Sequence, residues 1–111
     1  MEEPEVRIAR TESLFREVNE RIAESARRFE AHETEFVCEC SDPSCAHRVP
    51  ASLDAYERVR SEGARFLLAP GHADDRIEEV VERRRRYDVV EKVHRVVAAH
   101  ARRLNPRAEP A

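Results

Sequence analysis

Three cysteines stand close together in the chain, and their spacing is the strongest chemical signal that it carries. Cys38 and Cys40 are separated by one residue, and Cys45 follows after the turn-forming residues 41–44. Residues two apart on an extended segment point to the same side, and the turn can return the third thiol toward the other two. An odd number of cysteines cannot all pair as internal disulfides, whereas converging thiolates bind soft divalent metals. The spacing therefore predicts a metal site, and Zn²⁺ is the ion that we expect.

Two histidines compete for the fourth place that a structural zinc site needs. His47 follows Cys45 by two residues, so one short loop would supply every ligand. His72 comes directly after Pro70-Gly71 and would instead tie two distant parts of the chain together, which favours it in a protein with a thin core. The predicted ligands are therefore Cys38, Cys40, Cys45 and His72. His47 remains an alternative to His72, and cysteines can also serve as small buried core residues without a metal.

The expected role of such a site is structural. Three thiolates and a histidine complete a tetrahedron and leave no position for an activated water, so we expect no catalysis. A catalytic version would need one ligand to be absent, with Glu39 as the nearest base. Oxidation of the thiols could also expel the metal, which would make the protein a redox sensor. The sequence contains no phosphate-binding glycine loop and no nucleophile motif, and we expect that it is not an enzyme.

Length and composition restrict the class of protein further. A chain of 111 residues has room for one domain, 1–111, and its 39% of charged residues leave a thin core. Its apolar runs are far shorter than the roughly 20 residues that cross a bilayer, so no membrane-embedded protein is expected. The acidic start, residues 1–5, lacks the apolar stretch of a secretory signal, which predicts a reducing, cytoplasmic location. The net charge of −3 argues against broad, charge-driven binding of nucleic acid.

A long amphipathic helix is predicted over residues 5–33. Apolar or small residues recur there at alternating steps of three and four, and Leu14 and Ala26 widen the stripe. We expect this stripe to cover the domain's own core, with a dimerising coiled coil as the alternative. The stripe consists of Ile8, Thr11, Phe15, Val18, Ile22, Ser25 and Phe29.

The predicted zinc-binding core spans residues 34–92. A strand is expected over 35–40, a helix over 52–61 with Ser52 as its N-cap, and a buried strand over 65–68. Residues 77–92 are ambiguous between a helix, which the spacing of apolar residues favours slightly, and a hairpin. The hairpin would pair 79–83 with 87–92, and its β-branched residues support it.

A C-terminal helix is expected over 93–104, followed by a frayed tail over 105–111. The densest basic run, Arg83–Arg86, could contact phosphate, although a solvated turn balanced by neighbouring glutamates is the simpler interpretation. Aromatic residues make up only 5% of the chain, which is a poor basis for stacking on single strands.

Several motifs together resemble a known family. They are Phe36-Val37-Cys38-Glu39-Cys40, Cys45, Tyr56-Glu57-Arg58-Val59-Arg60, Arg65-Phe66, Pro70-Gly71-His72, Val80-Val81-Glu82-Arg83, Tyr87 and Val89-Val90-Glu91-Lys92. This pattern is similar to a family of short zinc-ribbon-like proteins from high-GC Gram-positive bacteria, for which no activity is established. The resemblance implies that the three cysteines and His72 belong together, without His47. It also implies a hairpin over 79–92, although Arg84–Arg86 stand where the family has a turn-forming residue.

These observations predict a single α+β domain. It consists of a long N-terminal helix, a small zinc-tied antiparallel sheet with a β-hairpin, an inserted helix and a C-terminal helix. The expected function is that of a small cytoplasmic zinc-binding protein that acts as a protein-interaction or regulatory module, and a partner or a second copy would contact its helix faces. The alternatives are a nucleic-acid-associated regulator that uses the Arg83–Arg86 edge, and a thiol redox sensor.

Overall fold

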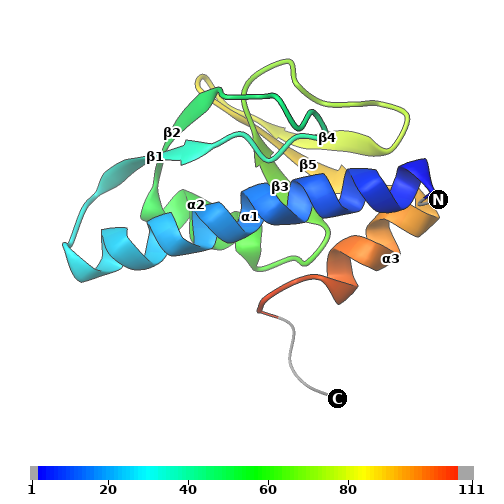
Figure 1. Ribbon diagram of the computed structural model, residues 1–111. Helices are drawn as coiled ribbons and strands as arrows, with labels where there is room; N and C mark the ends of the chain where they lie inside the picture. Colours follow the sequence, from blue (N-terminus) through cyan, green and yellow to red (C-terminus); the bar gives the residue numbers. More distant parts are fainter. Residues whose placement is uncertain (1–2, 108–111) are drawn as a thin grey trace.

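Two small antiparallel sheets lie behind one long helix (Figure 1). The computed structural model describes residues 3–107. Its elements are α1 (Pro4–Arg28), β1 (Glu33–Val37), β2 (Arg48–Ser52), α2 (Leu53–Arg60), β3 (Arg65–Leu68), β4 (Glu78–Arg83), β5 (Asp88–Lys92) and α3 (Arg95–Arg103). The α+β class predicted from the sequence is confirmed. Strands β1 and β2 form one sheet, and the other has the order β3-β5-β4.

The ambiguous segment 77–92 is a β-hairpin, so the helix that its apolar spacing slightly favoured is wrong. Strand β5 pairs on one side with β4 and on the other with β3, which places Val90 opposite both Val80 and Phe66. A central strand buried on both faces favours β-branched residues over a helical stripe. The turn between β4 and β5 contains no glycine or asparagine. It is closed by a hydrogen bond from the Arg84 N–H to the Tyr87 carbonyl at 2.8 Å.

The segment that carries the first two cysteines connects the two sheets. Strand β1 ends at Val37, earlier than the predicted 35–40, and it pairs with β2, which the sequence analysis did not predict. Beyond β1 the chain runs on toward the other sheet, where the Glu39 N–H donates to the Leu67 carbonyl at 2.8 Å. Strand β2 was hard to recognise because it contains Pro50, which only an edge strand tolerates.

Helix α1 ends five residues before the predicted 33. Glu30 adopts a positive φ of 55°, and the Ala31 N–H donates back to the Ala26 carbonyl at 2.9 Å. The Glu30 N–H also donates to the Arg27 carbonyl at 3.3 Å. These two bonds form a Schellman motif, which stops a helix even where glutamate replaces the usual glycine.

The face of α1 that packs against the protein is not the predicted apolar stripe. Val18, Phe29 and the flanking Leu14 are exposed, and much of the remaining stripe is only half-buried. Small and polar side chains of α1 face the interior instead. Their burial is tolerated because the polar groups form hydrogen bonds or ion pairs with other parts of the protein. The buried residues of the helix are Ala9, Glu12, Ser13, Arg16, Asn19, Ala23 and Ala26.

Buried charges on α1 are matched by partners on the sheet and on α3. The Arg16 guanidinium donates to the Gly63 carbonyl at 2.8 Å and to the Ala101 carbonyl at 2.7 Å. The Lys92 ammonium pairs with the carboxylates of Glu12 and Glu78. Because these buried charged groups have partners, a chain rich in charged residues can still form a solvent-excluded core.

The remaining helices lie close to their predicted places. Ser52 caps α2 as predicted, since its Oγ accepts the Ala55 N–H at 3.0 Å. Helix α3 spans Arg95–Arg103, within the predicted 93–104, and packs beside the N-terminal half of α1 (Figure 1). Within the described part of the chain, no helix is long and apolar enough to cross a bilayer.

The segment after α3 is not frayed throughout as predicted. The Arg107 guanidinium donates to the carboxylates of Glu20 at 2.6 Å and of Glu57 at 2.7 Å, which ties it to α1 and α2. Asn105 also accepts a hydrogen bond from Arg60. The prediction for residues 108–111 lies outside the described residues.

Candidate metal centre

The four residues predicted as ligands come together in the structure. Their ligand atoms all lie within 4.8 Å of one another. His72 Nδ1 is 3.6 Å from Cys38 Sγ and 3.7 Å from Cys45 Sγ. In a tetrahedral zinc site with Zn–S near 2.3 Å and Zn–N near 2.0 Å, neighbouring ligand atoms are separated by roughly 3.5–3.8 Å. The cluster of Cys38, Cys40, Cys45 and His72 could therefore bind a metal ion.

A tight turn returns Cys45 to the other two thiols. The Asp42 carboxylate accepts the Ser44 N–H at 2.9 Å, and the Asp42 carbonyl accepts the Cys45 N–H at 3.0 Å. The Cys38 N–H then donates to the His47 carbonyl at 3.2 Å, which closes the loop where β2 begins. An aspartate that bonds to its own downstream backbone is typical of such turns. The turn-forming residues between Cys40 and Cys45 thus do what the sequence predicts.

His72 is delivered by the turn that follows β3. Gly71 has a φ of +82°, a conformation that L side chains rarely adopt, and the His72 N–H donates to the Ala69 carbonyl at 3.1 Å. The Gly71 N–H donates to the carboxylate of Asp88, the first residue of β5, at 3.1 Å. No local sequence signal marks Asp88 for this role, because only the hairpin geometry brings it beside Gly71.

Backbone N–H groups point at two of the thiols. The Ala69 N–H donates to Cys38 Sγ at 3.2 Å, and the backbone of Asp42 hydrogen-bonds the Cys40 thiol. Burial nevertheless raises the pKa of both thiols, and the other cysteines nearby raise the pKa of Cys38 further. Without a cation these sulfurs are therefore protonated at neutral pH. A bound divalent metal would favour the thiolates, which the N–H donors then stabilise.

Glu39, the residue between the first two cysteines, is directed into the protein interior. Its carboxylate accepts hydrogen bonds from the Leu67 N–H at 2.9 Å, from the Asn19 amide at 2.8 Å and from the Tyr56 hydroxyl at 2.9 Å. Burial raises the pKa of Glu39, and these three donors offset part of that effect. The possibility that Glu39 could serve a catalytic metal as a base is therefore wrong, since its oxygens already hold the fold together.

His47 lies beside the cluster without being one of the four converging residues. Its Nδ1 is 3.7 Å from Cys45 Sγ, and its ring meets that of His72 edge to face with the centroids 4.4 Å apart. His47 is exposed, whereas His72 is half-buried. The geometry therefore favours His72 as the fourth ligand and places His47 as an outer neighbour.

No family model, curated protein or solved structure matches this chain. The resemblance to zinc-ribbon-like proteins of high-GC Gram-positive bacteria therefore stays a prediction.

Proposed function

We propose that this protein is a small zinc-binding module in which a Cys3His site joins two sheets into one scaffold, and that the scaffold serves protein interaction or regulation. The observation that carries the proposal is the 3.6 Å approach of Cys38 Sγ to His72 Nδ1, two atoms from segments that follow different sheets. Such a site holds a fold by cross-linking distant segments, and the free energy of metal binding adds to the free energy of folding.

Zinc fits the donor set better than other common ions. Three sulfurs and one imidazole nitrogen are soft or borderline ligands, whereas Mg²⁺ and Ca²⁺ prefer oxygen. With all four places filled by protein atoms, no position remains for a reacting water. A structural role without catalysis therefore follows from the proposed ligand set. Bound thiolates of this kind persist in a reducing compartment, in agreement with the cytoplasmic location that we propose.

The proposed interaction surface is the outer face of α1. Leu14 is 63% exposed and Val18 is 45% exposed, although both are large apolar residues on a well-formed helix. Leu14 also lines a shallow groove of about 160 Å³ together with Leu104, beyond the end of α3. Apolar side chains that the core does not use are typical of surfaces that meet a protein partner or a second copy.

Cobalt substitution tests the proposed coordination. Tetrahedral Co²⁺ bound by thiolates absorbs strongly in the visible and near-ultraviolet range, and we expect these bands to appear with one equivalent of Co²⁺ and to vanish when one equivalent of Zn²⁺ is added. The Cys40→Ser variant should lose intensity in the sulfur-to-metal band. An octahedral spectrum, or bands unchanged in Cys40→Ser, would contradict the proposed site.

The interaction surface needs a separate test. We expect size-exclusion chromatography with light scattering to show association of the zinc-loaded protein that increases with concentration, and Leu14→Gln combined with Val18→Gln to abolish it. Because both side chains are exposed, the double variant should keep its zinc content and its unfolding midpoint. A monomer at every concentration would contradict self-association and leave a different protein as the partner to be sought.

A further inference from the structure

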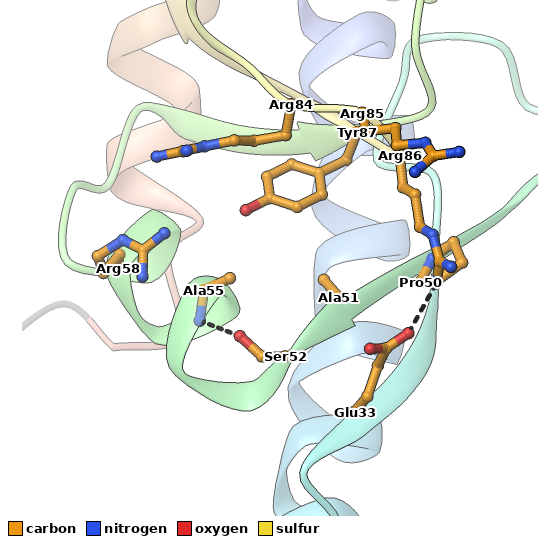
Figure 2. A pocket seen from close by; sticks show the side chains of 10 residues that line it. All are labelled: Glu33, Pro50, Ala51, Ser52, Ala55, Arg58, Arg84, Arg85, Arg86 and Tyr87. Carbon is orange, nitrogen blue, oxygen red and sulfur yellow. Dashed lines mark hydrogen bonds and ion pairs between the residues drawn. The ribbon is translucent and has the colours of Figure 1, made fainter.

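A cleft lined by arginines lies between the tip of the β4–β5 hairpin and the junction of β2 with α2. It is open to solvent and has a volume of about 370 Å³, which is in the size range of small-ligand sites. Figure 2 shows Arg84 extending from the hairpin turn toward the side of the cleft where Arg58 of α2 lies, and Arg85 and Arg86 extending toward the opposite side, where Arg86 meets Glu33. The remaining lining residues are Glu33, Pro50, Ala51, Ser52, Ala55 and Tyr87.

The charge of this cleft is opposite to that of the whole protein. Its four arginines and the single Glu33 give the lining a formal charge of +3, whereas the chain carries −3. Three of the four arginines already have an acidic partner. Arg58 is 3.8 Å from Glu82, which also pairs with Arg84, and Arg86 is 3.0 Å from Glu33. Arg85 has no ion-pair partner among residues 3–107. Exposed pairs of this kind are weak, so an anion could recruit these guanidinium groups.

Neutral donors complete the cleft. Ser52 Oγ accepts the Ala55 N–H at 3.0 Å, which leaves the serine's own hydroxyl hydrogen available to a ligand. The half-buried Tyr87 stands in the middle of the cleft with its hydroxyl directed toward α2 (Figure 2). The first turn of α2 borders the cleft as well, and the positive end of the helix dipole adds to the attraction for an anion.

We propose that this cleft is a binding site for the phosphate group of a small phosphomonoester. A dianion matches a +3 lining better than a single carboxylate does, and planar guanidinium groups bind phosphate oxygens in pairs. An extended polyanion fits less well, because Glu33 stands at the edge of the cleft and the rest of the surface is net acidic. The cleft does not include the cysteines, so anion binding there does not depend on whether the proposed metal site is correct.

The test is a titration of the ¹⁵N-labelled, zinc-loaded full chain with AMP, followed by amide shifts in NMR spectra. We expect the shifts to gather at residues 50–58 and 84–87, and inorganic phosphate to move the same amides and compete with AMP. Arg85→Gln should weaken AMP binding by about tenfold or more, because it removes a charged hydrogen-bond donor. Arg83→Gln is the matched control, since Arg83 is an exposed arginine on the same hairpin that does not line the cleft, and it should leave AMP affinity within about twofold.

Several results would overturn the proposal. If adenosine bound as tightly as AMP, the phosphate group would not contribute to binding. If Arg83→Gln and Arg85→Gln lost the same AMP affinity, binding would reflect general attraction to positive charge and not a specific site. A response to a short DNA duplex without any response to AMP or phosphate would replace the small-molecule site with a nucleic-acid surface. The absence of shifts with AMP and phosphate at millimolar concentration would leave the cleft without this function, whatever the metal content of the protein.

Discussion

Cys38 Sγ lies 3.6 Å from His72 Nδ1, although the two residues are 34 positions apart and follow strands of different sheets. The contact is supported on both sides. The Ala69 N–H donates to Cys38 Sγ, and the turn through Ala69 and His72 starts at the end of β3. A metal held by these atoms would therefore oppose separation of the two sheets, and loss of the metal should loosen the fold at this junction first.

Gly71→Ala should weaken both folding and metal binding. The φ of +82° is unfavourable for alanine, so we expect a loss of about 1 kcal/mol in the free energy of unfolding. Because the same turn presents His72, zinc affinity should also fall, as measured by competition with a chromophoric chelator. Glu62→Ala changes an exposed residue outside this turn and serves as the control. Zinc affinity unchanged in Gly71→Ala would mean that this turn does not hold His72 in place.

Arg16→Met should destabilise the packing of α1 against α3. The substitution removes hydrogen bonds to the carbonyls of Gly63 and Ala101 and the cation–π contact with Phe66, where the guanidinium carbon is 4.6 Å from the ring centroid. We expect a loss of about 2–4 kcal/mol in urea unfolding, because two carbonyls lose charged donors in the interior. Arg21→Met on the exposed side of the same helix should change stability by less than about 0.5 kcal/mol. Equal effects of the two variants would contradict this account.

The buried carboxyl of Glu12 should make stability depend on pH. Burial raises the pKa of Glu12 from 4.5 to about 7, and Lys92 offsets only part of that effect. The folded state therefore binds this proton more tightly than the unfolded chain, and the stability that Glu12 contributes falls as pH rises from 4.5 to 7.

Comparison with Glu12→Gln isolates this contribution. Both proteins contain the same metal site, so the pH dependence of that site cancels in the difference between them. We expect the wild type to lose about 1–3 kcal/mol of stability relative to Glu12→Gln between those two pH values. A relative gain over the same interval would show that Glu12 is already ionised beside Lys92.

The three thiols should differ in reactivity once the metal is removed. Cys38 and Cys40 are buried and burial raises the pKa of each, whereas Cys45 is half-buried. We expect iodoacetamide to leave the zinc-loaded protein unmodified and, after chelation, to alkylate Cys45 first, as peptide mass spectrometry would show. Labelling in denaturant gives the reference in which all three react alike. Rapid alkylation of Cys38 in the zinc-loaded protein would contradict its place as a ligand.

The sequence predicted the structure best at residue types that occur in few kinds of local structure, such as clustered cysteines, turn-forming prolines and glycines, and helix caps. The cysteine spacing, the turn residues between Cys40 and Cys45 and the Pro70-Gly71 pair led to the four residues that the structure brings together. The cap at Ser52 and the strand over 65–68 followed from equally specific local signals. These features depend on short-range geometry, which sequence patterns report well.

Two of the failures have the same physical cause, which is the burial of charged side chains. The apolar stripe of α1 suggested the wrong face, because Arg16 and Glu12 are buried through partners supplied by Ala101 and Lys92, more than 70 positions away. Glu39 was interpreted as a possible base because nothing local predicts its partners Asn19, Tyr56 and Leu67. Long-range pairing of this kind becomes visible only in the folded chain.

The most direct test of the central claim is native mass spectrometry of the wild type, His72→Ala and His47→Ala, each with and without a strong chelator. The account predicts one zinc per chain in the wild type and in His47→Ala, and loss or marked weakening of zinc binding in His72→Ala. The unfolding midpoint should fall in parallel, to that of the chelated wild type. A wild type without metal when purified reduced and free of chelator would contradict the account, and so would a His72→Ala variant that holds zinc as tightly as the wild type.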